Sequence, residues 1–277
     1  MTPQKSAAQL LPIETPSIET PSEGPFYIAA TQVAGRPTRT LKYGDTFVVL
    51  DSRGDIAVAS GRSAGLFHLD TRYLSRLELL VNGVPPLLLG STLRDDNSAL
   101  FADLTNPDLI VDQRIVLERD SVHILRTVFL WRGTAYQRLR VRNYGDHAIN
   151  FPLSIVFAND FADLFEVRGT CRERRGSATA RVHGDDQVVL SYHGLDAKLR
   201  RTTLNFDPPP QRLALDSAVY DLHIAPGETR PIFLAVSCDL GQSRPPLFLR
   251  GLVAARRESR EAARHRTWVE TSNDLFN

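Results

Sequence analysis

Residues 135–143, AYQRLRVRN, indicate the fold class because their side chains alternate in character. One set of alternate positions holds Ala135, Gln137, Leu139 and Val141, and the other holds Tyr136, Arg138, Arg140 and Arg142. Successive side chains of a β-strand point to opposite faces of its sheet. The pattern therefore predicts a strand with one face on an apolar core and the other face in water.

Other strand-length segments occur along the chain, and short turn signals separate them. The turn signals are Asn82-Gly83, Arg132-Gly133-Thr134, Asn143-Tyr144-Gly145-Asp146, His183-Gly184-Asp185-Asp186, His193-Gly194 and Pro226-Gly227. The helical patterns that a βαβ sheet would place between its strands are missing from this region. We therefore expect an all-β fold, a large antiparallel β-sandwich that occupies residues 38–245.

The two ends of the chain differ from this pattern. Residues 1–37 include the tandem repeat IETPSIETPS at 13–22, whose prolines and polar residues predict a flexible tail. Residues 251–270 are rich in Ala, Arg and Glu and predict a helix, within a linker region that spans 246–277. The apolar stripe of this helix is thin, so we expect part of its surface to be buried against a neighbour outside the sandwich.

Composition limits the partners that the chain could bind. Lys and Arg total 33 against 32 Asp and Glu, so there is no strong charge to attract nucleic acid or an anionic membrane. No apolar run is long enough for a membrane span or a secretory leader. The only two cysteines, Cys171 and Cys238, lie far apart, which argues against a disulfide framework and favours a cytoplasmic location.

Motifs for metals and cofactors are also missing from the sequence. The seven histidines are scattered without metal-ligand spacing, and the Asp-rich residues 94–109 lack the spacing of a calcium-binding EF-hand. Glycine motifs for nucleotides are absent as well. We therefore expect neither a metal nor a cofactor. The short basic stretch CRERRG, residues 171–176, predicts a solvated loop.

Residues 65–83, GLFHLDTRYLSRLELLVNG, join a polar segment to a strand that enters an Asn-Gly hairpin turn. The polar segment brings Asp70 and Arg72 close to His68 and Tyr73. These side chains could form an edge that hydrogen-bonds a sugar. The alternative, which we favour, is a buried Asp–Arg pair that ties two strands together, because buried charges are usually paired.

Residues 157–169, FANDFADLFEVRG, carry three carboxylates: Asp160, Asp163 and Glu166. A glycosidase uses two carboxylates about 5–10 Å apart, so this segment could be catalytic. On a helix, however, acids three residues apart would spread too widely for a tight acid–base couple. The alternative, which we favour, is a surface crossover whose aromatic side chains plug the sandwich while the acids face water or pair with Arg168.

With these residues in view, the chain resembles the N-terminal domain of bacterial glycogen debranching enzymes of the amylo-α-1,6-glucosidase type. The resemblance covers residues 38–277 and rests on four ordered segments: GLFHLDTRYLSRLELLVNG, LRDDNSALFADLTNPDL, DFADLFEVRG and GLDAKLRRTTLNFDPPP. It implies a supersandwich-like β-sandwich that a helix links to a catalytic (α/α)6-barrel. It also implies that the catalytic acid and base belong to the barrel, so no catalytic residue is carried over to this chain.

The resemblance gives a first hypothesis, a non-catalytic domain that supports the barrel and contacts α-glucan. Its candidate interface or substrate residues are Asp70, Arg72, Asp160, Asp163, Glu166 and Arg168. A second hypothesis is an independent α-glucan-binding module with exposed aromatic residues, drawn from Tyr73, Trp131, Tyr136 and Tyr144. A third is a self-sufficient glycosidase that uses Asp160, Asp163 and Glu166.

Overall fold

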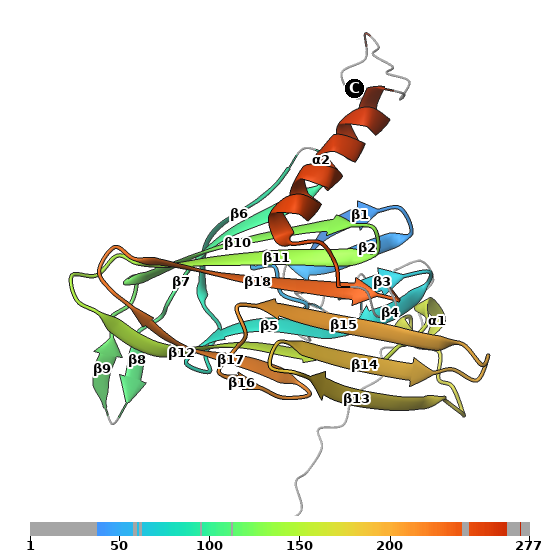
Figure 1. Cartoon of the computed structure of the whole chain (residues 1–277), viewed down its shortest axis with the longest axis horizontal. Helices are drawn as coiled ribbons and strands as arrows, with labels where there is room; N and C mark the ends of the chain where they lie inside the picture. The colour runs from blue at the N-terminus through green and yellow to red at the C-terminus, as the bar shows by residue number, and fades with distance from the viewer. Residues whose placement is uncertain are drawn as a thin grey trace, which may run out of the picture. The chain divides into compact units, whose positions relative to one another are not determined.

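In the computed structural model, eight antiparallel strands form the largest sheet (Figure 1). In spatial order they are β13 (Ser177–His183), β14 (Gln187–His193), β15 (Leu199–Asp207), β18 (Thr229–Cys238), β11 (Thr134–Asn143), β10 (Val122–Trp131), β7 (Ala99–Thr105) and β6 (Leu87–Leu93). All seven residues of the edge strand β13 are exposed. The wide sheet is therefore open to solvent at this edge.

Among the residues that the structure describes, two four-stranded sheets and one small hairpin complete the β structure. One sheet has the order β1 (Thr38–Tyr43), β2 (Thr46–Asp51), β3 (Gly65–His68), β4 (Thr71–Leu74). The other has the order β16 (Arg212–Leu213), β17 (Ser217–Ile224), β12 (Ile149–Ala158), β5 (Arg76–Val81). The hairpin consists of β8 (Leu109–Val111) and β9 (Arg114–Leu117). The helices are α1 (Leu164–Val167) and α2 (Phe248–Arg264).

The structure describes residues 38–57, 60, 63–94, 96–111, 113–239, 244–264 and 272, all within the unit of residues 35–277. The predicted tail at 1–37 lies outside them. The helix expected from residue 251 begins earlier, at Phe248, and its expected end at 270 also lies outside the described residues. No helix in these ranges has the length and apolarity needed to cross a bilayer. Both cysteines are free, Cys171 exposed and Cys238 buried.

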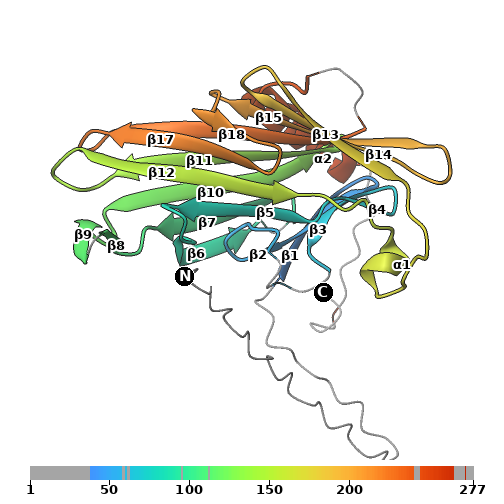
Figure 2. The same cartoon turned by 90° about the horizontal axis from the view of Figure 1, so that it is seen from below.

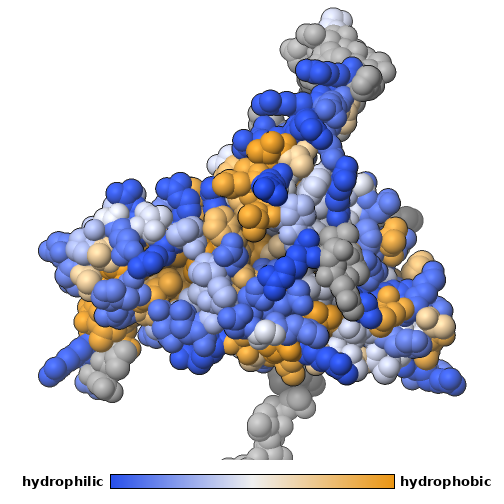
Figure 3. Space-filling view, in the orientation of Figure 1, coloured by the Kyte–Doolittle hydropathy of each residue, from blue (hydrophilic) through white to orange (hydrophobic). Residues whose placement is uncertain are grey.

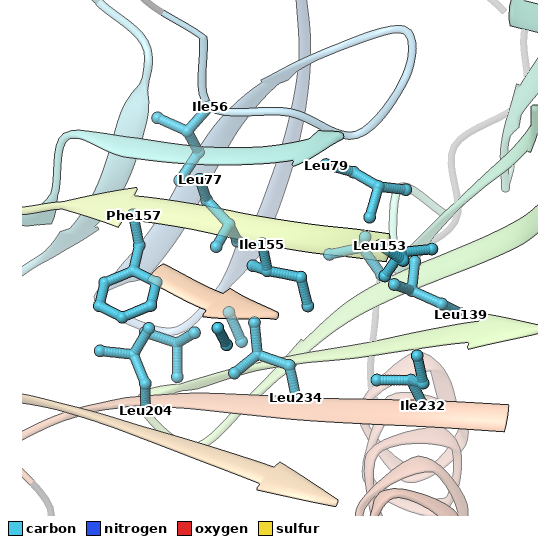
Figure 4. Packing of buried hydrophobic residues seen from close by; sticks show 14 of the residues in the cluster. Ile56, Leu77, Leu79, Leu139, Leu153, Ile155, Phe157, Leu204, Ile232 and Leu234 are labelled. Atoms are coloured by element: carbon cyan, nitrogen blue, oxygen red, sulfur yellow. The ribbon is translucent and has the colours of Figure 1, made fainter. Parts of the chain in front are cut away.

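The largest apolar cluster lies between the sheets, as expected for a β-sandwich. Figure 4 shows Leu153, Ile155 and Phe157 of β12 facing residues of the large sheet, among them Leu204 and Leu234. The sheet β1–β4 contributes to the same core through residues such as Leu41, which is fully buried. Seen from below, β5, β12 and β17 lie over the strands of the large sheet (Figure 2). The predicted all-β sandwich with a C-terminal helix is confirmed.

Strand β11 shows the predicted alternation with one exception. The positions at Ala135, Leu139 and Val141 are buried in the core, and Arg140 on the opposite face is exposed. Tyr136 lies on that opposite face, which the pattern predicts to be exposed to solvent, yet only 1% of the Tyr136 surface is exposed. The reason is that α2 covers it, because a Cβ on Gly251 would lie 3.0 Å from the Tyr136 ring. Alternation identified the two faces correctly but could not show that a helix covers one of them.

Helix α2 is anchored to the large sheet at two points. At its base the Phe248 ring contacts Phe129 and Phe233, with ring centroids 5.1 and 5.5 Å away. Further along, the Glu258 carboxylate accepts hydrogen bonds from Trp131 Nε1 at 3.0 Å, from Arg132 Nη2 at 2.7 Å and from the Tyr43 hydroxyl. Figure 3 shows an apolar patch at the base of α2 and hydrophilic residues along its length. Leu249 and Val253 remain exposed on the helix.

A charged group in the sandwich interior connects all three main sheets. Arg126 of β10, 1% exposed, donates through Nη1 to the carboxylate of Asp55 and through Nε and Nη2 to Gln137 Oε1 of β11, at 3.1 and 2.9 Å. Asp55, which follows β2, accepts a further bond from the Leu79 backbone N–H of β5 at 3.1 Å. An ion pair this deeply buried is costly to break, because removing one partner leaves the other charge unpaired.

Replacing Asp55 with Ala should therefore lower the free energy of unfolding by about 3–5 kcal/mol, since the Arg126 guanidinium would lose its counter-charge away from water. Urea denaturation measures the change. Arg212→Ala is the matched control, because the Arg212–Asp221 pair is exposed and should contribute at most about 1 kcal/mol. Equal effects of the two substitutions would contradict a structural role for the buried pair.

The close contact at Gly251 gives a second test. On an open helix surface, Gly→Leu would stabilise by helix propensity. Here we expect Gly251→Leu to destabilise the docked helix by about 1–3 kcal/mol, because the new side chain would overlap the Tyr136 ring. Tryptophan fluorescence should report the release of Trp131 from Glu258. Val253→Leu, at an exposed position of the same helix, should leave the spectrum unchanged.

Candidate functional site

The candidate residues meet where the β3–β4 turn contacts the segment that follows β12. Leu69 and Asp70 form the turn with positive φ values of 45° and 60°. The Arg72 N–H donates to the Ala162 carbonyl at 2.8 Å, and the Leu164 N–H donates to the Asp70 carbonyl at 3.2 Å. We call residues 69–72 together with 160–175 the loop cluster. Backbone hydrogen bonds thus bring together two stretches that are about ninety residues apart in sequence.

Arg72 pairs with Asp160 and not with Asp70. Its Nε donates to Asp160 Oδ1 at 3.1 Å, its Nη2 reaches the other carboxylate oxygen, and its Nη1 donates to the Ala64 carbonyl at 3.2 Å. The side chain fits because residue 65 is glycine, where a Cβ would lie 2.5 Å from Arg72 Cδ. The expected buried pair of Asp70 and Arg72 is therefore wrong: the acid that Arg72 contacts comes from the segment after β12, and the pair is only partly buried. The Asp70 side chain is exposed.

Asp163 and Glu166 form the N-terminal cap of α1. Asp163 Oδ1 accepts the N–H groups of Phe165 and Glu166 at 2.8 and 2.9 Å, and Glu166 Oε2 accepts the Asp163 N–H at 3.0 Å. This reciprocal arrangement is a capping box, which satisfies N–H groups that a helix start leaves without partners. Both carboxylates therefore stabilise the start of α1.

Arginines of the CRERRG stretch neutralise the same acids. Arg172 pairs with Asp163, and Arg175 Nε lies 3.2 Å from Glu166 Oε1. Arg175 also donates to the Asp160 carbonyl. Sequence reasoning predicted a solvated loop here and missed these contacts, although three arginines close to three acids were a signal. The expected partner of the acids, Arg168, instead has an exposed side chain at the C-terminal end of α1.

The electrostatics of Asp163 do not suit a general acid. Partial burial alone would raise its pKa, but hydrogen bonds from the backbone N–H of Glu166, from Arg172 and from the N–H of Phe165 outweigh that effect and lower the pKa. A glycosidase acid catalyst needs a raised pKa so that it holds a proton near neutral pH. The arrangement instead keeps Asp163 ionised and engaged with the loop.

A cavity of about 260 Å³ opens beside the loop cluster. Asp163 and Glu166 line it, and so do several residues of the β14–β15 hairpin: Tyr192, Gly194, Leu195, Asp196 and Arg200. The Tyr192 ring stacks on Phe161 with 5.5 Å between centroids, and Arg200 forms a two-pronged pair with Asp196 at 3.1 and 2.9 Å. Asp163 and Glu166 pair with Arg172 and Arg175, and Asp196 pairs with Arg200, so the three acids that line the cavity are each paired with an arginine.

Several aromatic residues considered for a sugar platform are not available at the surface. Tyr73 and Tyr136 are buried, with 2% and 1% of each exposed, and the indole N–H of Trp131 is bonded to Glu258. Tyr144 is exposed and sits beside His123 and Arg142. Phe165, expected to plug the sandwich, is also exposed, whereas Phe157 and Phe161 are buried as expected.

Together the fold and the loop cluster define a large antiparallel β-sandwich domain in which Asp160, Asp163 and Glu166 are paired with arginines. The chain belongs to the family described as the N-terminal domain of (some) glycogen debranching enzymes, which matches residues 41–235. No match was found among curated proteins.

Several solved structures are similar to this chain. The Slr1438 protein from Synechocystis sp. PCC 6803 is similar with a TM-score of 0.51 and 11% identity, over 77% of this chain and 99% of that one. A protein assigned as a kojibiose phosphorylase from the human microbiome has a TM-score of 0.44 and 10% identity, over 73% of this chain and 27% of that one. A protein assigned as an aldose 1-epimerase from Escherichia coli K12 has the same score and identity, over 74% and 99%.

The capping role of Asp163 can be tested with two substitutions. Asp163→Ala should weaken the hydrogen-exchange protection of the Phe165 and Glu166 amides, corresponding to about 0.5–2 kcal/mol for a lost cap. Asp163→Asn keeps an acceptor and should retain most of that protection. Because the folded-state pKa of Asp163 is lowered, the advantage of Asp over Asn should exist above the unfolded pKa near 3.9 and disappear as the pH falls through the folded pKa. Equal protection in the wild type and both variants would contradict the cap.

Proposed function

We propose that this chain is the non-catalytic N-terminal domain of a glycogen-debranching-type glycoside hydrolase of the amylo-α-1,6-glucosidase type. The proposal rests on the membership of this chain in the family described as the N-terminal domain of (some) glycogen debranching enzymes. In this proposal the partner is a catalytic (α/α)6-barrel of the same polypeptide, and the substrate of the whole enzyme is an α-glucan. The same proposal places the protein in the cytoplasm, where its two free thiols would be kept reduced.

The state of the acids supports a non-catalytic role. Asp160, Asp163 and Glu166 each contact an arginine, and two of them also cap α1. A self-sufficient glycosidase would need one acid that holds a proton and another placed across the scissile bond. The alternative of a catalytic loop cluster therefore requires several native contacts to break first.

The docking of α2 supports a neighbouring domain. Phe248 and Glu258 hold one side of the helix on the sheet, while Leu249 and Val253 on another side are 61% and 67% exposed. Exposed apolar side chains close together on one helix mark a surface suited to a partner. In our proposal this surface and the loop cluster residues Asp70, Arg72, Asp160, Asp163, Glu166 and Arg168 contact the barrel or its glucan.

The proposal predicts that the isolated chain does not hydrolyse α-1,6-branched oligosaccharides. Glucose release should equal the enzyme-free rate, because the acid and base would lie on the barrel. A commercial glucosidase with the same substrate is the positive control for the assay. Clear turnover by the chain that Asp163→Asn abolishes would overturn the proposal in favour of a catalytic loop cluster.

The proposed partner can be tested at the level of the gene. We expect the coding sequence that follows Asn277 to encode a helical repeat rich in acidic and aromatic residues, as an (α/α)6-barrel would require. A protein that includes this region should release glucose from the same substrate. A stop codon directly after Asn277, with no such frame beside it, would contradict a partner in the same polypeptide.

A further inference from the structure

A cavity of about 650 Å³ lies between α2 and the sandwich. Its volume is within the range of small-molecule sites. Three separate parts of the chain line it: the end of β1 with the turn that follows, the turn between β6 and β7, and the side of α2 that carries Leu252 and Ser259. None of its lining residues belongs to the cavity beside the loop cluster.

Contacts between residues far apart in sequence hold these walls in place. The Tyr43 hydroxyl at the end of β1 donates to the Glu258 carboxylate of α2. Ala99 at the start of β7 lies opposite Phe129 of β10, and the Phe129 ring contacts Phe248 at the base of α2. The cavity is therefore formed by the folded chain itself, and its walls keep a defined position relative to one another.

Positive charges outnumber negative ones in the lining. The acids that line the cavity are Asp96 and Glu258, and the cations are Lys42, Arg94, Arg256 and Arg260. All four cations have exposed side chains, so a ligand in the cavity can reach them. They come from β1, from the β6–β7 turn and from α2, so they converge on the cavity from three elements.

Both acids of the lining already have partners. Asp96 Oδ1 accepts bonds from the N–H and the hydroxyl of Ser98 at 3.0 and 2.5 Å, and it lies 3.6 Å from Arg94 Nε. Glu258 accepts the bonds from Trp131, Arg132 and Tyr43 that anchor α2.

The three remaining cations, Lys42, Arg256 and Arg260, have no hydrogen-bond or ion-pair partner among the described residues. Their positive charge is therefore left without a counter-charge in this part of the chain. A concave surface that gathers charge of one sign attracts ligands of the opposite sign.

The spacing of two of these cations also opposes helix stability. Arg256 and Arg260 are four residues apart on α2, which places them side by side on the helix surface, and like charges at this spacing destabilise a helix. Elsewhere on the same helix the spacing is used favourably, because Arg257 lies 3.7 Å from Glu261. A local rule that is broken without compensation is expected at functional positions.

We infer that this cavity binds a small anion that carries two or more phosphate groups. A guanidinium group presents N–H donors in a planar fork that matches phosphate oxygens, and the Lys42 ammonium adds a point charge from the opposite wall. A single carboxylate would neutralise one of the three cations, whereas a diphosphate carries enough charge for all three. The half-buried Leu252 and Ala255 of the lining would suit an apolar group attached to the phosphates. Such a ligand differs from the glucan of the proposed enzyme, so the inference goes beyond the proposed function.

Titration of the whole chain with inorganic pyrophosphate tests the inference. In buffer with about 0.15 M salt, which screens attraction beyond about 8 Å, isothermal titration calorimetry should show saturable binding with a Kd below about 1 mM. Arg256→Gln and Arg260→Gln should each weaken binding about fivefold, the effect of one lost exposed ion pair. Arg250→Gln removes the same charge from an exposed position of α2 outside the lining, so it is the matched control and should bind like the wild type.

Lys42→Gln tests whether both walls of the cavity take part. It should weaken pyrophosphate binding by a similar factor, while the melting temperature stays at the wild-type value because the Lys42 side chain is exposed. Absence of saturable binding to the wild type would overturn the inference. Equal losses in Arg250→Gln and Arg256→Gln would indicate diffuse attraction to a basic helix and overturn it too, as would a Lys42→Gln variant that binds like the wild type. These outcomes are separate from glucose release, which tests the proposed function.

Discussion

The buried group of Arg126, Asp55 and Gln137 is the interaction on which the arrangement of the sheets depends. One guanidinium joins β10, β11 and the segment after β2, and Asp55 adds the backbone of β5. A sandwich held only by aliphatic contacts could slide by small steps, since such contacts have little directionality. Hydrogen bonds to a buried charge allow one position, because any shift leaves that charge unpaired. The cluster thereby fixes how the three sheets meet.

The same requirement for pairing explains the loop cluster. Arg72 reaches Asp160, while Arg172 and Arg175 reach Asp163 and Glu166. The Arg72–Asp160 pair joins the β3–β4 turn to the segment before α1, while Arg172 and Arg175 pair with acids of their own stretch of chain. These carboxylates are therefore already paired and are not free for acid–base chemistry.

Sequence patterns predicted well which strand faces line the core of the sandwich. They predicted poorly which outer faces are buried by other elements. Alternation in β11 identified Leu139 and Val141 as core, because the two faces of a strand follow from backbone geometry alone. It could not show that α2 buries Tyr136 from the other side. Asp70 was paired with Arg72 on proximity in sequence, yet Asp160, 88 residues from Arg72, is the partner. The spacing D-x-x-E of Asp163 and Glu166 is that of a capping box, but the sequence interpretation treated these acids as catalytic groups or as surface groups that face water or pair with Arg168.

The two attachment points of α2 have a mechanical consequence. Phe248 and Glu258 are ten positions apart, which corresponds to about 15 Å along a helix axis. Two fixed points on a stiff rod determine its direction, whereas one would leave it free to swivel. The direction of the α2 axis relative to the sandwich is therefore fixed, and so is the direction in which a polypeptide would continue from α2. A domain attached to this rigid helix would sample a far smaller volume than a domain attached through a flexible linker.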